Sequence, residues 1–288
     1  MTSKTSTTGT FKAVWQLLRL EHGIMYGIAV LVGIIITSDM AFQFDKAFFG
    51  FLTALFLQAS AFALNDYFDY EVDVANKRFD RPLVRGELKK EHALFLAVFL
   101  APAGFISALR ISHEAFLFAL LITAMGYAYD IKLKEFGFAG NVYIAASMAA
   151  PFLFGGIVAG FVELPVVVLS AIAFVSGLAR EIMKGIEDVE GDALRNVRTV
   201  ARVRGIDFAS KLSAMLFLTS VALSFLPLTL PEFMDLKYII PVAVTDVMLI
   251  SISRKLISGV GKDEIGKLRK DTLKAMFLGL IAFIGGAF

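Results

Sequence analysis

Nine apolar runs almost free of charged residues constrain how this chain can fold. Because 57% of its residues are hydrophobic and its mean hydropathy is +0.73, a water-soluble globule of 288 residues could not bury them all. Lipid offers no partner for bare backbone groups, so each run is expected to be a helix. We therefore predict an all-α integral membrane protein whose single domain, residues 1–288, is a bundle of nine transmembrane helices. The runs lie at roughly 23–38, 47–64, 93–109, 115–129, 136–162, 164–179, 212–230, 238–253 and 275–288, and Asp246 breaks the eighth.

The positive charges divide unevenly between the two sides of such a bundle. If the runs cross in alternation, 25 of the 28 Lys and Arg residues fall on the side of the N-terminus, and three fall on the other side. The positive-inside rule places the N-terminus in the cytoplasm and the C-terminus outside the cell membrane. Several runs are shorter than a full span, so the charged stretches beside them are expected to enter the membrane depth and line a cavity.

The second run leads into an acidic motif, NDYFDYEVD, at residues 65–73. Asn65, Asp69 and Asp73 are spaced four residues apart, which stacks their side chains on one face of a helix. The sixth run leads into DVEGD at residues 188–192, in which Asp188 and Asp192 repeat the spacing. Both motifs precede a basic stretch, in loops at about 65–92 and 180–211. This repeat at 119 residues predicts two four-helix halves related by a pseudo-axis.

Carboxylates at this density require a cation to neutralise them. Oxygen ligands favour Mg²⁺ or Ca²⁺, while the chain has no cysteine and only three scattered histidines. Mg²⁺ commonly leaves coordination positions for phosphate oxygens, and the neighbouring Lys and Arg would hold the remaining phosphate charge. Two acidic motifs with a basic rim at the mouth of an apolar bundle therefore predict a diphosphate site whose ligand is otherwise hydrocarbon. No nucleic-acid partner is expected.

The two motifs closely resemble those of the UbiA superfamily of intramembrane prenyltransferases, NDxxDxxxD after the second helix and DxxxD after the sixth. Asn76-Lys77 and Arg81-Pro82-x-x-x-Gly86 are similar to the family's cytoplasmic loop. The run from Arg180 to Asp192 most resembles the digeranylgeranylglyceryl phosphate synthases. The resemblance covers nearly the whole chain.

The resemblance implies Mg²⁺-dependent transfer of a polyprenyl group from its diphosphate. It also implies that six side chains of the two motifs are metal ligands: Asn65, Asp66, Asp69, Asp73, Asp188 and Asp192. For Asp66, a supporting role beside the metal is equally open. Lys184 lies one turn before Asp188 and is expected to contact the diphosphate. The other diphosphate candidates are Arg81, Tyr129 and Lys134.

The implied acceptor is the hydroxyl of a prenylglycerol phosphate, and the product is an ether lipid precursor. Glu181 lies two turns deeper than Asp188 on the same face, which suits a proton acceptor near that hydroxyl. Arg19 and His22, at the start of the first run, are expected to meet the acceptor's phosphate. Asp246 receives no role.

Two alternatives remain open from the sequence. An aromatic prenyltransferase of quinone synthesis would share the metal motifs and differ in its acceptor. A cation transporter would also place carboxylates in the membrane, although near its midplane and away from Lys and Arg.

Overall fold

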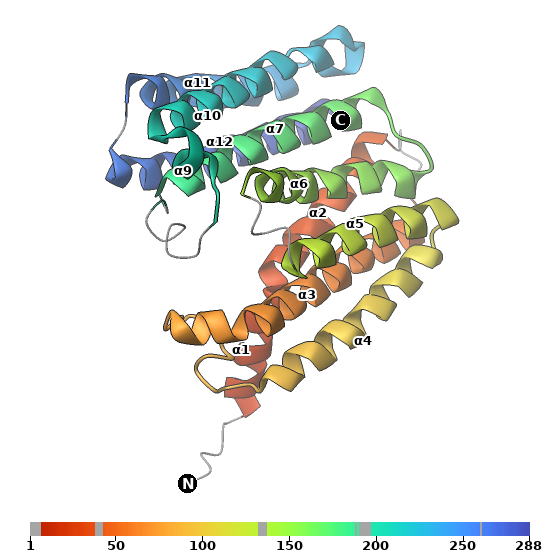
Figure 1. The fold of residues 1–288 in the computed structure, drawn as a ribbon. Helices are drawn as coiled ribbons and strands as arrows, with labels where there is room; N and C mark the ends of the chain where they lie inside the picture. Colours follow the sequence, from red (N-terminus) through yellow and green to blue (C-terminus); the bar gives the residue numbers. More distant parts are fainter. Residues whose placement is uncertain (1–6, 38–42, 132–136, 188, 190–196, 260) are drawn as a thin grey trace. The chain divides into compact units, whose positions relative to one another are not determined.

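The computed structural model describes residues 7–37, 43–131, 137–187, 189, 197–259 and 261–288 (Figure 1). These residues form α-helices, two short 3₁₀ helices and turns, with no strand among them, so the predicted all-α class is confirmed. The long elements are α1 (Thr7–Leu18), α2 (Leu20–Thr37), α3 (Phe44–Ala75), α4 (Lys90–Leu109), α5 (His113–Ile131), α6 (Phe138–Ala159), α7 (Leu164–Glu187), α10 (Ile206–Leu223), α11 (Leu236–Ser258) and α12 (Lys262–Gly286). The short ones are α9 (Val200–Arg204), η2 (Leu226–Thr229) and η3 (Pro231–Phe233).

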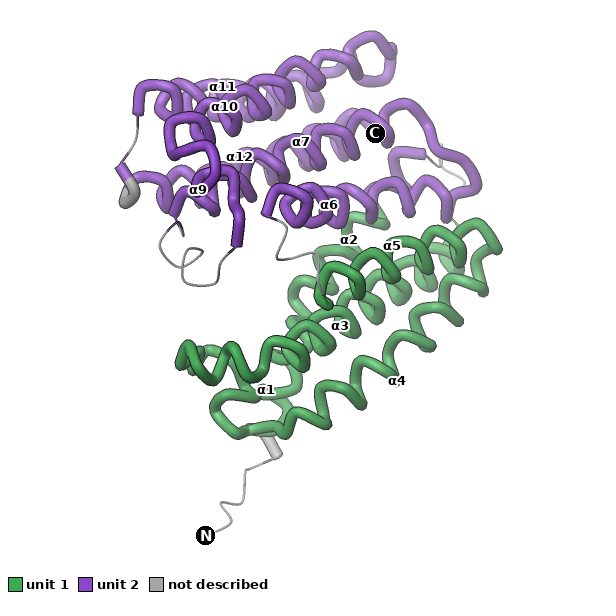
Figure 2. The backbone as a smooth tube through the Cα atoms, in the orientation of Figure 1, with its two compact units in different colours: residues 1–31, 43–131 green, residues 32–42, 132–288 purple. Residues whose placement is uncertain are grey.

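The chain forms two compact units, coloured separately in Figure 2. Unit 1 comprises residues 1–31 and 43–131. In it, α3 packs along α4 and also contacts α5 and α1. Small residues such as Ala59, Ala63 and Ala97 are fully or almost fully buried between these helices, which lets their backbones approach closely. The helix that carries the first acidic motif, α3, therefore packs against three other helices of unit 1.

Unit 2 comprises residues 32–42 and 132–288. Here α7 is the central helix, and it packs against α6, α10 and α12. Its most buried residues include Ala179, Ile182, Met183 and Ile186, which belong to one apolar cluster with residues of α10, α11 and α12. The helix that leads into the second acidic motif is thus held on several sides by protein.

Eight of the nine predicted spans correspond to helices that are long and apolar enough to cross a membrane, counting within the described residues. The ninth run forms the second half of α12. The first half of α12 carries Glu264, Lys267, Arg269, Lys270 and Asp271, so the helix as a whole is much less apolar than the others. The membrane class is confirmed, and the count of nine stays a prediction.

The sequence did not indicate α1, a 12-residue helix ahead of the first span. It ends at Leu18, and the next residue, Arg19, has a φ of 45°, which lies in the left-handed region. This conformation costs a non-glycine residue about 1–2 kcal/mol. The backbone therefore breaks at Arg19, and α2 begins at the next residue.

Glycine at position 137 permits a close contact in unit 2, just before α6. Its φ is +54°, and a Cβ there would collide with the carbonyl group of Arg198. On the other side of the same segment, Gly185 of α7 leaves room for Thr199, whose Cβ would lie 3.3 Å from an added methyl group. These two glycines seat residues 198–199 beside the C-terminal part of α7.

Candidate functional site

The first acidic motif lies on the last turns of α3. This helix has 32 residues, a length of roughly 48 Å, whereas the hydrocarbon core is about 30 Å thick. The surplus lets the helix carry its polar end beyond the apolar region. Because α3 is unbroken from Asn65 to Asp73, the predicted stacking of Asn65, Asp69 and Asp73 on one face is confirmed. Asp73 is buried, and the other two are partly buried.

Asp66 lies at the centre of an ion-pair cluster. Its side chain is 2% exposed, and its Oδ1 lies 2.7 Å from Nη2 of Arg19 and 3.2 Å from Nη1 of Arg81. Its Oδ2 is buried and accepts no hydrogen bond from the described residues. Two guanidinium groups therefore compensate a carboxylate that would otherwise be costly to bury.

The predicted diphosphate ligand Arg81 comes from the loop that follows α3. Its Nε lies 3.7 Å from Oδ2 of Asp73 and 3.8 Å from Oδ2 of Asp80. This Nε is buried and donates no hydrogen bond to a described residue. Arg81 thus lies beside carboxylates of the first motif and keeps a buried N–H group that no described residue uses. Such a group is suited to neutralise phosphate charge.

Asn65 of α3 is bonded to the end of α5, the helix that carries the predicted Tyr129. Nδ2 of Asn65 donates to Oδ1 of Asp130 across 3.0 Å, and Asp130 directly follows Tyr129. The bond leaves the amide oxygen of Asn65 available as a ligand while it fixes the orientation of the amide. Asp130 had no place in the sequence prediction, although it directly follows the fourth apolar run, where an acidic residue at membrane depth is a signal of function.

Arg19 and His22 have defined partners within unit 1. The guanidinium of Arg19 pairs with Asp66, and its carbon also lies 4.3 Å from the centre of the Phe62 ring. The imidazole of His22 packs edge-on against the same ring, at a centroid distance of 5.4 Å. Phe62, which the sequence did not single out, therefore supports both side chains. Their contact with an acceptor phosphate stays a prediction.

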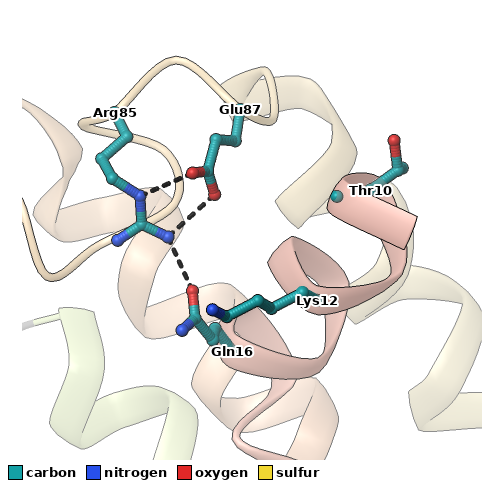
Figure 3. A pocket seen from close by; sticks show the side chains of 6 residues that line it. Thr10, Lys12, Gln16, Arg85 and Glu87 are labelled. Carbon is teal, nitrogen blue, oxygen red and sulfur yellow. Dashed lines mark hydrogen bonds and ion pairs between the residues drawn. The ribbon is translucent and has the colours of Figure 1, made fainter. Parts of the chain in front are cut away.

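Arg85 fastens the loop after α3 onto α1 (Figure 3). It donates to both carboxylate oxygens of Glu87, at 2.8 Å each, to Oε1 of Gln16 at 2.6 Å and to the carbonyl oxygen of Phe79 at 2.9 Å. The guanidinium holds the pKa of the Glu87 carboxyl below its usual range, and Arg78 does the same for Asp80. The loop that carries Arg81 is thereby tied at its two ends.

A polar cavity of about 310 Å³ lies at this junction of α1 and the loop. Figure 3 shows Lys12 and Gln16 of α1 on one side, with Arg85 and Glu87 on the other. Gly9 and Thr10 complete its lining. Arg85 and Glu87 of the loop are paired with each other, and Arg85 also donates to Gln16 of α1. The cavity therefore lies where α1 supports the loop.

In unit 2, charged side chains gather on the last turns of α7. Glu181 is 10% exposed; its Oε2 lies 3.7 Å from Nζ of Lys184, and its Oε1 lies 3.7 Å from Nη1 of Arg180. One turn further on, Glu187 pairs with Arg269 of α12. The predicted pair Glu181 and Lys184 is therefore brought together, with Glu181 deeper and Lys184 half exposed.

Three predicted residues, Lys134, Asp188 and Asp192, lie outside the described residues. In the part that is described, no three His, Asp or Glu side chains gather as a metal-binding group. The described donors nevertheless fit a hard cation. They are oxygen atoms of carboxylates and an amide, and one of them, Oδ2 of Asp66, is buried without a hydrogen-bond partner.

Asp246 is buried in unit 2 and has a defined environment. Its Oδ2 accepts a hydrogen bond from Oγ of Ser224 at 2.8 Å, and the hydroxyl of Tyr238 donates to the carbonyl oxygen of Ser224 at 2.6 Å. These bonds join the residue after the end of α10, Ser224, to Tyr238 and Asp246 of α11. They explain the acid within the eighth run as a group that ties the two helices together.

Comparison with known proteins agrees with this architecture. Residues 26–281 match the UbiA prenyltransferase family. A digeranylgeranylglyceryl phosphate synthase of Archaeoglobus fulgidus is 54% identical over 280 residues, 96% of each chain. A solved structure of digeranylgeranylglyceryl phosphate synthase is 30% identical, with a TM-score of 0.84 over 96% of this chain and 98% of the other.

A more distant solved structure is a UbiA homolog from Archaeoglobus fulgidus bound to DMAPP and Mg²⁺. It is 18% identical, and it matches 94% of this chain and 99% of its own with a TM-score of 0.66. This likeness establishes a shared fold. In that protein, the same fold holds a prenyl diphosphate together with a divalent metal ion.

Proposed function

We propose that this chain, which belongs to the UbiA prenyltransferase family, transfers a geranylgeranyl group from geranylgeranyl diphosphate to the free hydroxyl of geranylgeranylglyceryl phosphate. The observation that carries the proposal is the 54% identity to a digeranylgeranylglyceryl phosphate synthase over 96% of both chains. The chain is a membrane protein with eight candidate spans among its described residues. A hydrocarbon donor and a lipid acceptor suit such a bundle.

The donor's diphosphate requires both oxygen ligands for a metal and nearby positive charge. We assign Asn65, Asp69 and Asp73 of α3, together with Asp188 and Asp192, to two Mg²⁺ ions. When bound, Mg²⁺ would stabilise the negative charge of the departing diphosphate. Asp66 is assigned a supporting role, because Arg19 and Arg81 already occupy one of its oxygens.

The remaining diphosphate charge is assigned to cationic and hydroxyl side chains at the same end of the helices. Arg81 carries a buried donor that no described residue uses. Lys184 is half exposed on α7 and is free to turn toward a ligand. Tyr129 and Lys134 complete the proposed set, which is suited to orient the diphosphate before its bond to carbon breaks.

The reaction itself breaks the bond between C1 of the prenyl chain and the diphosphate oxygen, and the electron pair leaves with the diphosphate. The allylic carbocation is then captured by the acceptor's hydroxyl oxygen, which forms the ether bond and releases one proton. We assign that proton to Glu181, whose carboxylate is buried one turn inside Lys184. Water must be kept from the cation, so the apolar walls of the bundle take part in the chemistry.

The proposal places the active site at the cytoplasmic face of the cell membrane. The 25 to 3 division of Lys and Arg supports this orientation. By the same division, the acidic motifs at 65–73 and 188–192 are predicted to lie on the side of the membrane that holds most of these cations. A cation transporter gains no support from such a position, because Arg and Lys repel a travelling cation.

The test is an acceptor competition. Purified protein would be incubated with Mg²⁺, geranylgeranyl diphosphate and either geranylgeranylglyceryl phosphate or 4-hydroxybenzoate, and the products would be identified by mass spectrometry. The ether of geranylgeranylglyceryl phosphate is the expected product. Prenylation of 4-hydroxybenzoate alone would assign the chain to the aromatic prenyltransferases instead.

A further inference from the structure

Arg180 of α7 is a largely buried cation that has a buried donor without an acceptor among the described residues. Its side chain is 15% exposed, and its closest acidic neighbour among the described residues, Oε1 of Glu181, lies 3.7 Å from its Nη1. That distance is beyond a hydrogen bond. Its Nε is buried and has no acceptor among the described residues. A guanidinium has five N–H donors, and this one is left without an acceptor among the described residues.

Arg269 of α12 adds a second such cation from the helix packed against α7. Its Nη1 pairs with Glu187, while its Nε is buried and finds no acceptor in the described part of the chain. Its partner Glu187 lies seven residues, two helical turns, after Arg180 on α7, so the two share a face of that helix. Two guanidinium groups therefore lie along one face of α7, and each has a buried donor that no described residue uses.

Burying two guanidinium groups with unused donors costs free energy of folding unless an anion binds to them. Like charges repel strongly where water is scarce, and a buried donor without an acceptor loses the hydrogen bonds that it would make in water. Among the described residues, the carboxylates beside Arg180 and Arg269 are Glu181 and Glu187, and neither one accepts from the buried Nε groups. The two guanidinium groups offer these donors in the fork geometry that matches phosphate oxygens.

We propose that Arg180 and Arg269 form the binding site for the phosphate monoester of the lipid acceptor. This inference rests on the proposed function and names the part of the acceptor that the enzyme recognises. Arg180 directly precedes Glu181, the assigned proton acceptor. A phosphate held on Arg180 would therefore keep the adjoining glycerol, and its free hydroxyl, beside α7.

The donor's diphosphate is the other source of phosphate, and it fits this cluster less well. A diphosphate held through metal ions needs carboxylates that are free to bind metal. Here Glu187 is taken by Arg269, and Glu181 lies between Arg180 and Lys184.

The experiment compares three ligands on the full-length protein in detergent. Arg180→Ala, Arg180→Lys and Arg269→Ala would be measured against the wild type. Kinetic constants would be obtained for geranylgeranylglyceryl phosphate, for its dephosphorylated analogue geranylgeranylglycerol and for geranylgeranyl diphosphate. Binding of geranylgeranylglyceryl phosphate would also be measured by calorimetry in the presence of EDTA, where no transfer takes place.

The expected result is a selective loss of affinity for the phosphorylated acceptor. Arg180→Ala should raise its KM and its calorimetric Kd roughly 10–100-fold, the range of a charge-assisted hydrogen bond. The KM of the diphosphate should stay within about twofold of the wild-type value, and geranylgeranylglycerol should be used equally well by both proteins. Arg180→Lys should recover only part of the loss, because an ammonium lacks the two-pronged geometry.

Lys270→Ala is the matched control, because it removes an exposed positive charge next to Arg269 on the same helix. It should leave all constants unchanged. An equal rise in the KM of the diphosphate would overturn the inference in favour of a donor site, and unchanged constants in monodisperse Arg180→Ala would also overturn it. If the wild type itself forms no ether product, the proposed function fails, and that outcome is distinct from either of these.

Discussion

Arg19 and Asp66 are 47 residues apart in the sequence, and Nη2 of the first donates to Oδ1 of the second across 2.7 Å. The pair joins the break between α1 and α2 to the helix that carries the first acidic motif. Arg81 reaches the same oxygen from the loop after α3. A single carboxylate therefore holds together three parts of unit 1.

Because Asp66 has two cationic partners, the loss of either one should be tolerated better than the loss of both. Arg19→Ala or Arg81→Ala alone should lower the free energy of unfolding by about 1 kcal/mol, since one guanidinium remains. The double variant leaves a buried carboxylate unpaired, and such a change costs about 3–5 kcal/mol. Thermal unfolding of the four proteins in one detergent checks this, and strictly additive effects would contradict the shared ion pair.

The proposed metal ligands make a second prediction. Asp69→Ala and Asp188→Ala should abolish prenyl transfer while the protein remains monodisperse, because each removes an oxygen ligand that offsets phosphate charge. EDTA should stop the wild-type reaction, and added Mg²⁺ should restore it. Retention of activity within about tenfold, a barrier change of only ~1.4 kcal/mol, would rule out ligand roles for these two residues.

Glu71→Gln is the control for those variants. Glu71 lies on α3 between the motif residues, yet it is exposed, and its contact is with Lys90 at 3.5 Å. Removal of its charge should leave transfer nearly unchanged. A large loss here would mean that negative charge in general, rather than the individual ligands, supports the reaction.

A third prediction concerns Glu181. Glu181→Gln keeps the size and hydrogen bonding of the side chain but removes its basicity. If the carboxylate takes the proton of the acceptor's hydroxyl, kcat should fall about 10²–10⁴-fold while binding of a non-hydrolysable prenyl diphosphate stays the same. Single-turnover kinetics with an isothermal binding measurement would separate the two. A loss of diphosphate binding would move Glu181 into the metal site.

The contacts of Arg85 predict a pH-dependent loop. The pKa of Glu87 is lowered in the folded protein, so the pair stabilises the loop fully above the unfolded value of about 4.3. That stabilisation is lost as the pH falls through the lower folded pKa. Asp80, paired with Arg78, changes in the same direction. Amide hydrogen exchange of residues 76–88 at pH 7, 5 and 3.5 should show increased opening only at the lowest value.

Two variants test whether the pair of Arg85 and Glu87 controls the opening of this loop at low pH. Arg85→Ala should open the loop at neutral pH, and trypsin should then cut faster after Lys77 and Arg78. Glu87→Gln should exchange faster at pH 7 than the wild type and show a smaller change on acidification. If neither variant alters exchange in residues 76–88, the bonds of Arg85 to Gln16 and Phe79 do not hold the loop.

Orientation supplies the last prediction. Reporters fused after residue 89 or residue 205 should appear on the cytoplasmic side, and a reporter at the C-terminus should appear outside. The division of Lys and Arg motivates this arrangement. Cysteine accessibility in sealed vesicles gives an independent measurement, because the chain has no native cysteine. A cytoplasmic C-terminus would show that α12 does not complete a ninth crossing.

Helices and motif faces could be predicted from this sequence because both depend on local spacing. The runs that became α2 to α7 are uncharged over most of a span, and the spacing of Asn65, Asp69 and Asp73 needs only one unbroken helix. α1 was missed because its 12 residues mix polar and apolar side chains. The break at Arg19 was also missed, since a left-handed conformation of an arginine has no local sequence signal.

The partners of the site residues could not be predicted, because they come from distant parts of the chain. The bond of Asn65 to Asp130 and the pairing of Glu187 with Arg269 depend on which helices are neighbours. Spacing alone does not determine that. Arg19 illustrates the point, since its position at the start of the first apolar run gave no indication that its guanidinium pairs with Asp66.

The two halves of α12 bear on how this protein is made. Its apolar half is shorter than a full span, and its other half is strongly charged, so the segment is a poor substrate for insertion into lipid by itself. Yet Ile265, Leu268, Ala275 and Ala282 are fully or almost fully buried, and α12 packs on α7 and α11. Helices that are synthesised earlier, α7 and α11, therefore provide the packing surface that α12 needs. A mutation that weakens α7 or α11 should first appear as a defect in the biogenesis of α12, before any catalytic step is affected.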